Sequence, residues 1–187
     1  IDARPDIMIP GVGLREEMRL TRDAARDIAE ATIAAAGGTA VPYRIGTMIE
    51  LPRACVVAGD LAEFAEFFSF GTNDLTQTTY GFSRDDAEAS FIPRYLEKSV
   101  LTDDPFQVLD RTGVGALMTF AVERGRAARA SLKIGICGEH GGEPSSIAFC
   151  EELDLDYVSC SPYRVPIARL AAAQAALARA ASSSVRA

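Results

Sequence analysis

The sequence lacks an excess of basic residues and any long hydrophobic run, and each absence excludes a class of protein. Lysine and arginine together number 19 against 26 aspartate and glutamate residues, which gives a net charge of −7. No basic patch of the kind that binds nucleic acid is present. The apolar stretches fall well short of the roughly 20 residues that cross a membrane. We therefore expect no nucleic-acid partner and no membrane span.

Paired cysteine motifs are also absent. The four cysteines are Cys55, Cys137, Cys150 and Cys160, with no C-x-x-C pair and no spacing typical of a zinc site. Reduced thiols in a cytosol-like compartment are the simplest interpretation, so we expect a cytoplasmic location, with a plastid or another organelle still compatible. The start at Ile1 has neither a methionine nor a signal-peptide pattern, which indicates a piece of a longer polypeptide.

The remaining composition is that of a soluble globular domain, with 187 residues of which 48% are hydrophobic. Short apolar runs alternate with helical patterns, and no two strands follow each other directly. Strands are predicted at 7–9, 44–49, 67–71, 133–137 and 157–160. This alternation is typical of a parallel sheet with helices outside it. At roughly 37 residues for each βα unit, eight units need about 300 residues, as in a (β/α)8 barrel.

The predicted fold class is therefore α/β, as the C-terminal five βα units of a (β/α)8 TIM-type barrel. The alternative is a five-stranded doubly wound domain, which would normally open with a glycine-rich phosphate loop. The turn at 10–13 (PGVG) matches that loop poorly. A capping-box pattern predicts a helix that starts at Asp60. The alanine-rich last helix is expected to fray over 178–187.

The connection from Tyr80 to Thr112 is long and carries only short helical patterns. Connections of this length in a compact domain usually have a function or form an interface. We call residues 80–112 the excursion.

The strand at 67–71 ends in Gly71, Thr72, Asn73 and Asp74. Parallel α/β proteins place their chemistry at such strand ends, although these residue types also form ordinary helix-capping turns. Glu50 follows the preceding strand in the same way, so the two carboxylates are expected to converge. Two carboxylates with room for water suit Mg2+. The alternative for Glu50 is a salt bridge to Arg53.

Cys137 lies at a third strand end, between Gly135 and Gly138. Free cysteines are most often small core residues. The flanking glycines favour the close approach of a ligand, and a thiol beside a metal-bound carbonyl compound could exchange a proton with carbon. His140, the only histidine, is predicted either to tune Cys137 or to brace the loop.

Four stretches closely resemble the pyruvate, phosphate dikinase family. They are GTMIELPRA (46–54), FFSFGTNDLTQ (67–77), GICGEHGGEPSS (135–146) and YVSCSPYRVPIARL (157–170). The likeness extends over about residues 1–177. Phosphoenolpyruvate synthase and the first enzyme of the bacterial sugar phosphotransferase system share the residues at the strand ends, but not the loop 139–146 as it stands here.

The resemblance implies that the chain, residues 1–187, is the C-terminal portion of a phosphoenolpyruvate/pyruvate-binding barrel domain. The family interconverts ATP, phosphate and pyruvate with AMP, pyrophosphate and phosphoenolpyruvate. Metal ligands would be Glu50 and Asp74 for Mg2+, and the substrate would also meet Gly71, Thr72 and Asn73. Cys137 would be the acid/base that moves a proton on or off the methyl carbon.

The resemblance also implies partners outside the chain. These are the phosphohistidine and nucleotide-binding domains, which bind ATP, and a second copy in a homodimer. The substrate-binding arginines of the family would precede Ile1, so the chain alone is expected to be inactive. The alternatives are a phosphoenolpyruvate synthase-like phosphotransferase, a binding module without catalysis, and an oligomerisation piece with the excursion as its interface.

Overall fold

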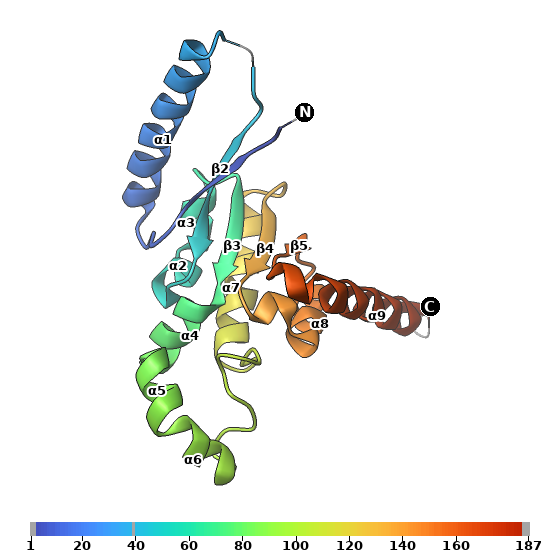
Figure 1. The fold of residues 1–187 in the computed structure, drawn as a ribbon. Helices are drawn as coiled ribbons and strands as arrows, with labels where there is room; N and C mark the ends of the chain where they lie inside the picture. Colours follow the sequence, from blue (N-terminus) through green and yellow to red (C-terminus); the bar gives the residue numbers. More distant parts are fainter. Residues whose placement is uncertain (1–2, 39, 185–187) are drawn as a thin grey trace.

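Five strands form one sheet in the computed structural model, which describes residues 3–38 and 40–184. The strands are β1 (Asp6–Ile9), β2 (Arg44–Ile49), β3 (Phe67–Gly71), β4 (Lys133–Cys137) and β5 (Tyr157–Val158). All neighbouring pairs are parallel, and the order in space is the order along the chain (Figure 1). A doubly wound sheet reverses its order at a switch point, whereas a (β/α)8 barrel does not. The fold is α/β and corresponds to five βα units of a TIM-type barrel, as predicted.

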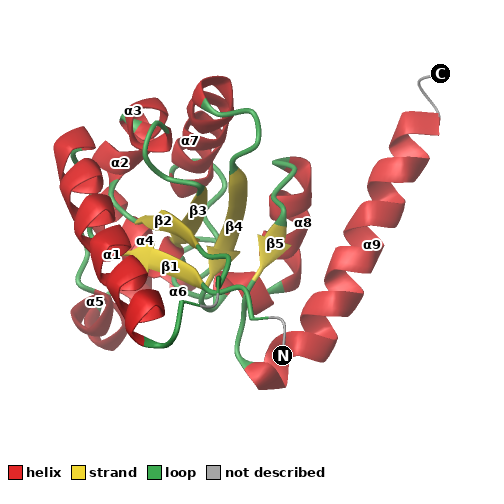
Figure 2. Cartoon of the chain, turned by 90° about the horizontal axis from the view of Figure 1, so that it is seen from above, coloured by secondary structure: helices red, strands yellow, loops and turns green. Residues whose placement is uncertain are grey.

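Helices alternate with the strands along the chain. They are α1 (Arg15–Ala35), α2 (Pro52–Val56), α3 (Ala58–Ala62), α4 (Thr72–Tyr80), α5 (Arg84–Ser90), α6 (Ile92–Glu97), α7 (Val114–Ala128), α8 (Pro144–Glu152) and α9 (Val165–Ser184), with 3-10 turns η1 (His140–Gly142) and η2 (Pro162–Arg164). Seen from above, α1, α3, α7 and α8 surround the curved sheet on one side (Figure 2). No helix among these described residues is long and apolar enough to cross a membrane.

Two boundaries differ from the sequence prediction. The helix expected to start at Asp60 is α3, which starts at Ala58 because the Leu61 N–H already bonds to the Val57 carbonyl. Asp60 lies in its first turn, where an acidic residue also favours a helix. Strand β5 stops at Val158 rather than 160 and pairs only with β4 among the described residues. The predicted frayed tail is helical as far as Ser184, and 185–187 lie outside the described residues.

The core lies between β3, β4 and α7. All five residues of β3 are buried, as expected for a parallel strand covered on both faces. Phe68, Phe70 and Ile136 are fully buried and belong to one cluster with Met118 of α7. This rigid centre holds the carboxyl ends of β2, β3 and β4 in a fixed arrangement.

The excursion carries α5 and α6 and extends away from the carboxyl ends of the strands (Figure 1). It has a small core of its own, in which Ala87, Ile92 and Phe106 are buried beside Phe82 and Phe91. The two aromatic rings stack edge to face with centroids 4.9 Å apart. The excursion is therefore an ordered subdomain rather than a loose loop.

Candidate functional site

The residues predicted to carry chemistry lie at one end of the sheet. Glu50 follows β2 directly, Thr72 to Asp74 follow β3, and Cys137 is the last residue of β4. The register pairs Gly71 with Cys137, and it pairs Ile49 with Phe70. The sheet therefore brings together residues that are far apart in the sequence. Glu50 is 24 positions from Asp74 and 87 positions from Cys137.

Glu50 is buried, with 6% of its surface exposed, and its Oε1 accepts a hydrogen bond of 2.5 Å from the Gly11 N–H. Burial raises the pKa of Glu50, the Gly11 N–H acts in the opposite direction, and the Asp74 carboxylate beside it raises the pKa further. Arg53 instead donates to the Gly13 carbonyl. The alternative of a Glu50–Arg53 salt bridge is not found among the described residues.

Gly71 makes room for Glu50. A Cβ at this position would lie 2.8 Å from Glu50 Oε2 and 3.0 Å from the Met48 sulfur. Any side chain at Gly71 would therefore push the Glu50 carboxylate out of place.

Asp74 is exposed beside Glu50, and its orientation is set by two amides. Its Oδ1 accepts hydrogen bonds from Gln77 Nε2 at 3.0 Å and from Asn73 Nδ2 at 3.4 Å. The Gln77 amide is oriented in turn because its Oε1 accepts the Arg84 backbone N–H at 2.8 Å. Asp74 and Glu50 line an open hollow of about 570 Å³ together with Gly11, Leu51, Gln77, Thr78, Gly81 and Phe82.

Two adjacent carboxylates, one of them buried, repel each other unless one of them is protonated or a cation lies between them. No cluster of three or more His, Cys, Asp or Glu side chains suited to a metal occurs in 3–38 and 40–184. Glu50 and Asp74 thus offer two protein ligands and leave the other positions for water or substrate. That donor set fits Mg2+, which keeps several waters and binds through one or two carboxylates.

Cys137 is half-buried, and its Sγ lies 3.5 Å from the Phe70 carbonyl, to which the thiol donates. Burial raises the pKa of the thiol, the Ser69 hydroxyl lowers it, and the Glu50 carboxylate raises it. At neutral pH the sulfur therefore carries its proton. This is the state of a proton donor rather than of a thiolate nucleophile.

The glycines beside Cys137 have explanations other than a ligand, which corrects the sequence interpretation. A Cβ on Gly135 would lie 2.4 Å from the Tyr157 ring, so Gly135 admits that ring. Gly138 has a φ of +90°, a conformation that side chains other than glycine rarely adopt. Neither residue is evidence for the close approach of a substrate.

His140 forms its hydrogen bonds with Thr72 and Pro105 rather than with Cys137. Its Nδ1 lies 2.7 Å from Thr72 Oγ1, and its Nε2 lies 3.0 Å from the Pro105 carbonyl. Of the two predicted roles, the structure therefore favours the loop brace. Thr72 is 1% exposed, and its hydroxyl is buried against the imidazole of His140.

We predict that His140 makes stability fall in mild acid. Burial lowers the pKa of His140, while the Pro105 carbonyl acts in the opposite direction. Below the unfolded pKa of about 6.5, the unfolded chain binds a proton at His140 more readily than the folded chain does. The free energy of unfolding is therefore highest above that pH and decreases as the pH falls below it. The slope from this residue is at most about 1.4 kcal/mol per pH unit, the value for one proton. Thermal unfolding between pH 7 and 5 measures it against His140→Gln, whose curve should be flatter. Equal curves would contradict the prediction.

Sequence reasoning missed three contacts of the site. The Gly11 N–H reaches Glu50 from the end of β1, and Gln77 orients Asp74. Arg84 donates to Glu139 at 2.6 Å and to Asn73 Oδ1 at 3.3 Å, which links the excursion to two strand ends. The only sequence signal was the turn after β1, where a glycine occupies the same strand-end position as in the other units.

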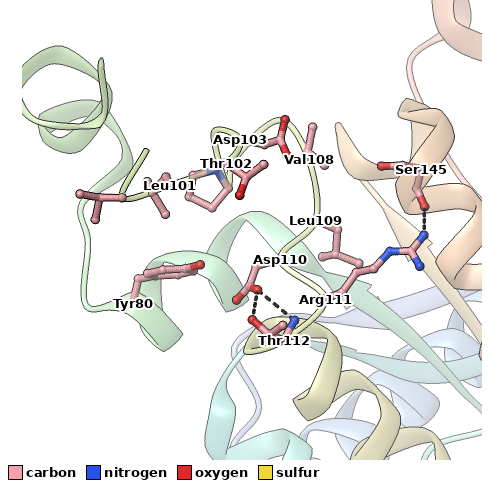
Figure 3. A pocket seen from close by; sticks show the side chains of 12 residues that line it. Tyr80, Leu101, Thr102, Asp103, Val108, Leu109, Asp110, Arg111, Thr112 and Ser145 are labelled. Carbon is pink, nitrogen blue, oxygen red and sulfur yellow. Dashed lines mark hydrogen bonds between the residues drawn. The ribbon is translucent and has the colours of Figure 1, made fainter. Parts of the chain in front are cut away.

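A second hollow of about 520 Å³ lies between α4 and the loop before α7 (Figure 3). Burial acts to raise the pKa of its Asp110, but hydrogen bonds from Thr112, Gly113 and Val114 outweigh this and hold the pKa below its usual range. Burial and the Asp110 carboxylate raise the pKa of Tyr80 to about 12. Asp110 therefore caps the start of α7, and its hydrogen-bonding capacity is used for structure.

Comparison with known proteins places the chain among phosphoenolpyruvate enzymes. The family described as "PEP-utilising enzyme, PEP-binding domain" matches residues 2–177. The chain is 59% identical over 174 residues to pyruvate, phosphate dikinase 1, chloroplastic, of Arabidopsis thaliana, covering 93% of this chain and 18% of that protein. It is 57% identical over 177 residues to pyruvate, phosphate dikinase of Clostridium symbiosum, covering 95% and 20%. The chain thus spans about a fifth of the length of these relatives.

A solved structure supports the fold alone. A citrate lyase from Burkholderia xenovorans LB400 superposes with a TM-score of 0.54 at 19% identity, covering 89% of this chain and 48% of that one. The sequence matches carry the assignment, because they include both the strand ends and the loop 139–146. The chain therefore belongs to the family of PEP-utilising enzymes, through the PEP-binding domain that residues 2–177 match.

Proposed function

We propose that the chain is the part of a pyruvate, phosphate dikinase that binds pyruvate or phosphoenolpyruvate and moves the proton between pyruvate and its enolate. The observation that carries this proposal is the grouping of Glu50, Asp74 and Cys137 at one end of the sheet, with the charge of Asp74 acting on Glu50 and the charge of Glu50 acting on Cys137. A protonated thiol can give its proton to the carbon of an enolate, and the thiolate that results can take a proton back from the methyl carbon. A pair of carboxylates could hold the metal ion that stabilises the enolate oxygen.

Glu50 and Asp74 would hold Mg2+, which would stabilise the oxygen of the enolate as its negative charge develops. The Gly71 and Thr72 backbone and the Asn73 amide would orient the substrate beside the carboxylates. The Asn73 carbonyl oxygen is occupied by Arg84, so the amide nitrogen is the end that is directed toward Asp74 and available as a donor.

Cys137 would add a proton to the methylene carbon when pyruvate forms and would take one from the methyl carbon in the reverse direction. The raised pKa of the thiol keeps this proton in place at neutral pH. The nearby Glu50 carboxylate disfavours a lasting thiolate, so the proton returns readily from carbon or water to sulfur. Proton transfer by a positioned group typically contributes about 10²- to 10⁴-fold to a rate.

The remainder of the reaction belongs to parts outside this chain. We propose that a nucleotide-binding domain that uses ATP and a phosphohistidine domain supply the phosphoryl group, and that the parent enzyme is a homodimer. The expected location is the cytoplasm, or a plastid as for the chloroplastic relatives. A phosphoenolpyruvate synthase-like phosphotransferase is the alternative with the same chemistry at carbon.

A chimeric enzyme tests the proposal. This chain replaces the matching segment of the Clostridium symbiosum dikinase, to which it is 57% identical. We expect the chimera to form phosphoenolpyruvate from pyruvate, ATP and phosphate, and to exchange pyruvate methyl protons with solvent in the presence of Mg2+. A folded chimera that binds pyruvate but exchanges no protons would contradict the proposal. Turnover that does not need inorganic phosphate would instead favour the synthase-like alternative.

A further inference from the structure

We propose that His140 is a positioning residue that fixes the substrate-binding turn after β3 by accepting the Thr72 hydroxyl proton, while its other nitrogen fastens that turn to the excursion. This inference rests on the proposed function, because it assigns the turn 71–74 to the substrate. Thr72 opens the long connection between β3 and β4, Pro105 lies in the excursion of that same connection, and His140 lies in the connection between β4 and β5. A single imidazole joins these three points.

The direction of each hydrogen bond follows from the partners. The Pro105 carbonyl can only accept, so Nε2 of His140 must carry a hydrogen and donate it over 3.0 Å. In a neutral imidazole Nδ1 is then the acceptor. The Thr72 hydroxyl must therefore donate to Nδ1 over 2.7 Å. One tautomer satisfies all three groups.

The hydrogen bond between His140 and Thr72 is buried, so water cannot replace either partner. His140 and Thr72 are each 1% exposed. Leaving a buried polar group without its hydrogen-bond partner costs about 1–3 kcal/mol. Rotation of either side chain away from the other is therefore unfavourable. Thr72 is also the first residue of α4 and precedes Asn73 and Asp74. Fixing the Thr72 side chain therefore fixes the first turn of α4, from which the metal and substrate groups project.

The backbone beneath His140 gives the imidazole a rigid support. A Cβ on Gly141 would lie 2.3 Å from the Ser159 carbonyl oxygen, and one on Gly142 would lie 2.5 Å from the Arg164 side chain. The turn η1 is thus packed directly against the chain that follows β5. Support of this kind is what holds a binding group to within a fraction of an ångström.

Two conservative variants distinguish the two hydrogen bonds of His140, the one with Thr72 and the one with Pro105. Asparagine places an amide oxygen near Nδ1 and can still accept from Thr72, whereas glutamine places an amide nitrogen near Nε2 and can still donate to Pro105. Each variant loses one buried hydrogen bond, so both should lose similar thermal stability. In the full-length chimera we expect KM for pyruvate to stay within about threefold for His140→Asn. It should rise about tenfold or more for His140→Gln, the range found when outer supports of a site are removed.

Thr72 provides the matched control. Thr72→Val should raise KM as His140→Gln does, and Thr72→Val added to His140→Gln should raise it little further, because both changes break one contact. Thr72→Ser keeps the donor and should raise KM clearly less than Thr72→Val does, which tests the inference even if a histidine variant does not fold. Phosphoryl transfer from ATP to the carrier histidine should be unchanged in every variant.

Equal KM values for the Asn and Gln variants, or independent additive effects of the Thr72 and His140 changes, would overturn the inference. A Thr72→Ser enzyme that is as impaired as Thr72→Val would overturn it as well. These outcomes are distinct from failure of the proposed function. In that case the unmodified chimera would show no methyl-proton exchange that depends on Cys137.

Discussion

Replacing Cys137 by alanine should abolish exchange of the pyruvate methyl protons with solvent, with a loss of about 10²- to 10⁴-fold or more. The thiol is the protonated group beside Glu50 at the end of β4, and alanine leaves nothing there that can donate. Serine should fail almost as completely, because a hydroxyl is a far weaker acid than a thiol. Proton exchange followed by NMR in deuterated water measures the rate directly in the full-length enzyme.

Cys160→Ala is the matched control for Cys137. Cys160 is also partly buried near a strand end, but it packs against Ile147 and Ala168 on the side of α9. Exchange should be unaffected by that change. Mg2+ binding and phosphoryl transfer from ATP should survive in Cys137→Ala, since both carboxylates are intact. If Cys137→Ala still exchanges the pyruvate methyl protons near the normal rate, Cys137 is a packing residue and not the acid/base.

The position of polar residues at the ends of buried strands explains why the sequence predicted the grouping of Glu50, Asp74 and Cys137. A buried apolar run followed by Gly71 and Asp74 predicts both a strand and the point where it surfaces. The same pattern recurs at Glu50 and Cys137, and the sequential parallel order of the strands then brings the three together. The fold class was predictable for the same reason, because one βα unit after another leaves few alternatives.

The contacts that tune the site were not predictable from the sequence. The Gly11 bond to Glu50 joins residues 39 positions apart, and the His140 bond to Thr72 joins residues 68 apart. Each depends on the path of a loop, which local sequence does not determine. Gly135 illustrates the opposite error. A glycine beside a candidate catalytic residue suggested a ligand, but it makes room for the Tyr157 ring, which comes from the next unit.

Replacing Asp74 by asparagine should eliminate Mg2+-dependent exchange and turnover, by a factor of about 10³, while the fold remains intact. Asparagine keeps the size of the side chain and its hydrogen bond to Gln77, but it removes one of the two carboxylate charges that we propose bind Mg2+. Because the Asp74 charge helps to raise the pKa of Glu50, that pKa should move back toward its ordinary value in the variant. An Mg2+ titration of the exchange rate measures the loss, and Asp103→Asn, in the exposed part of the excursion, is the control.

Thermal unfolding distinguishes a shared metal site from two unrelated carboxylates. A ligand that binds only the folded state stabilises it by RT ln(1 + [L]/Kd), about 2.7 kcal/mol at 100 times Kd. Mg2+ should therefore raise the Tm of the wild type and of Asp103→Asn. Without Mg2+, Asp74→Asn should be at least as stable as the wild type, because the repulsion between Glu50 and Asp74 is gone, and added Mg2+ should leave its Tm almost unchanged. If Mg2+ stabilises Asp74→Asn as much as the wild type, the metal binds elsewhere, and Glu50 and Asp74 do not share it.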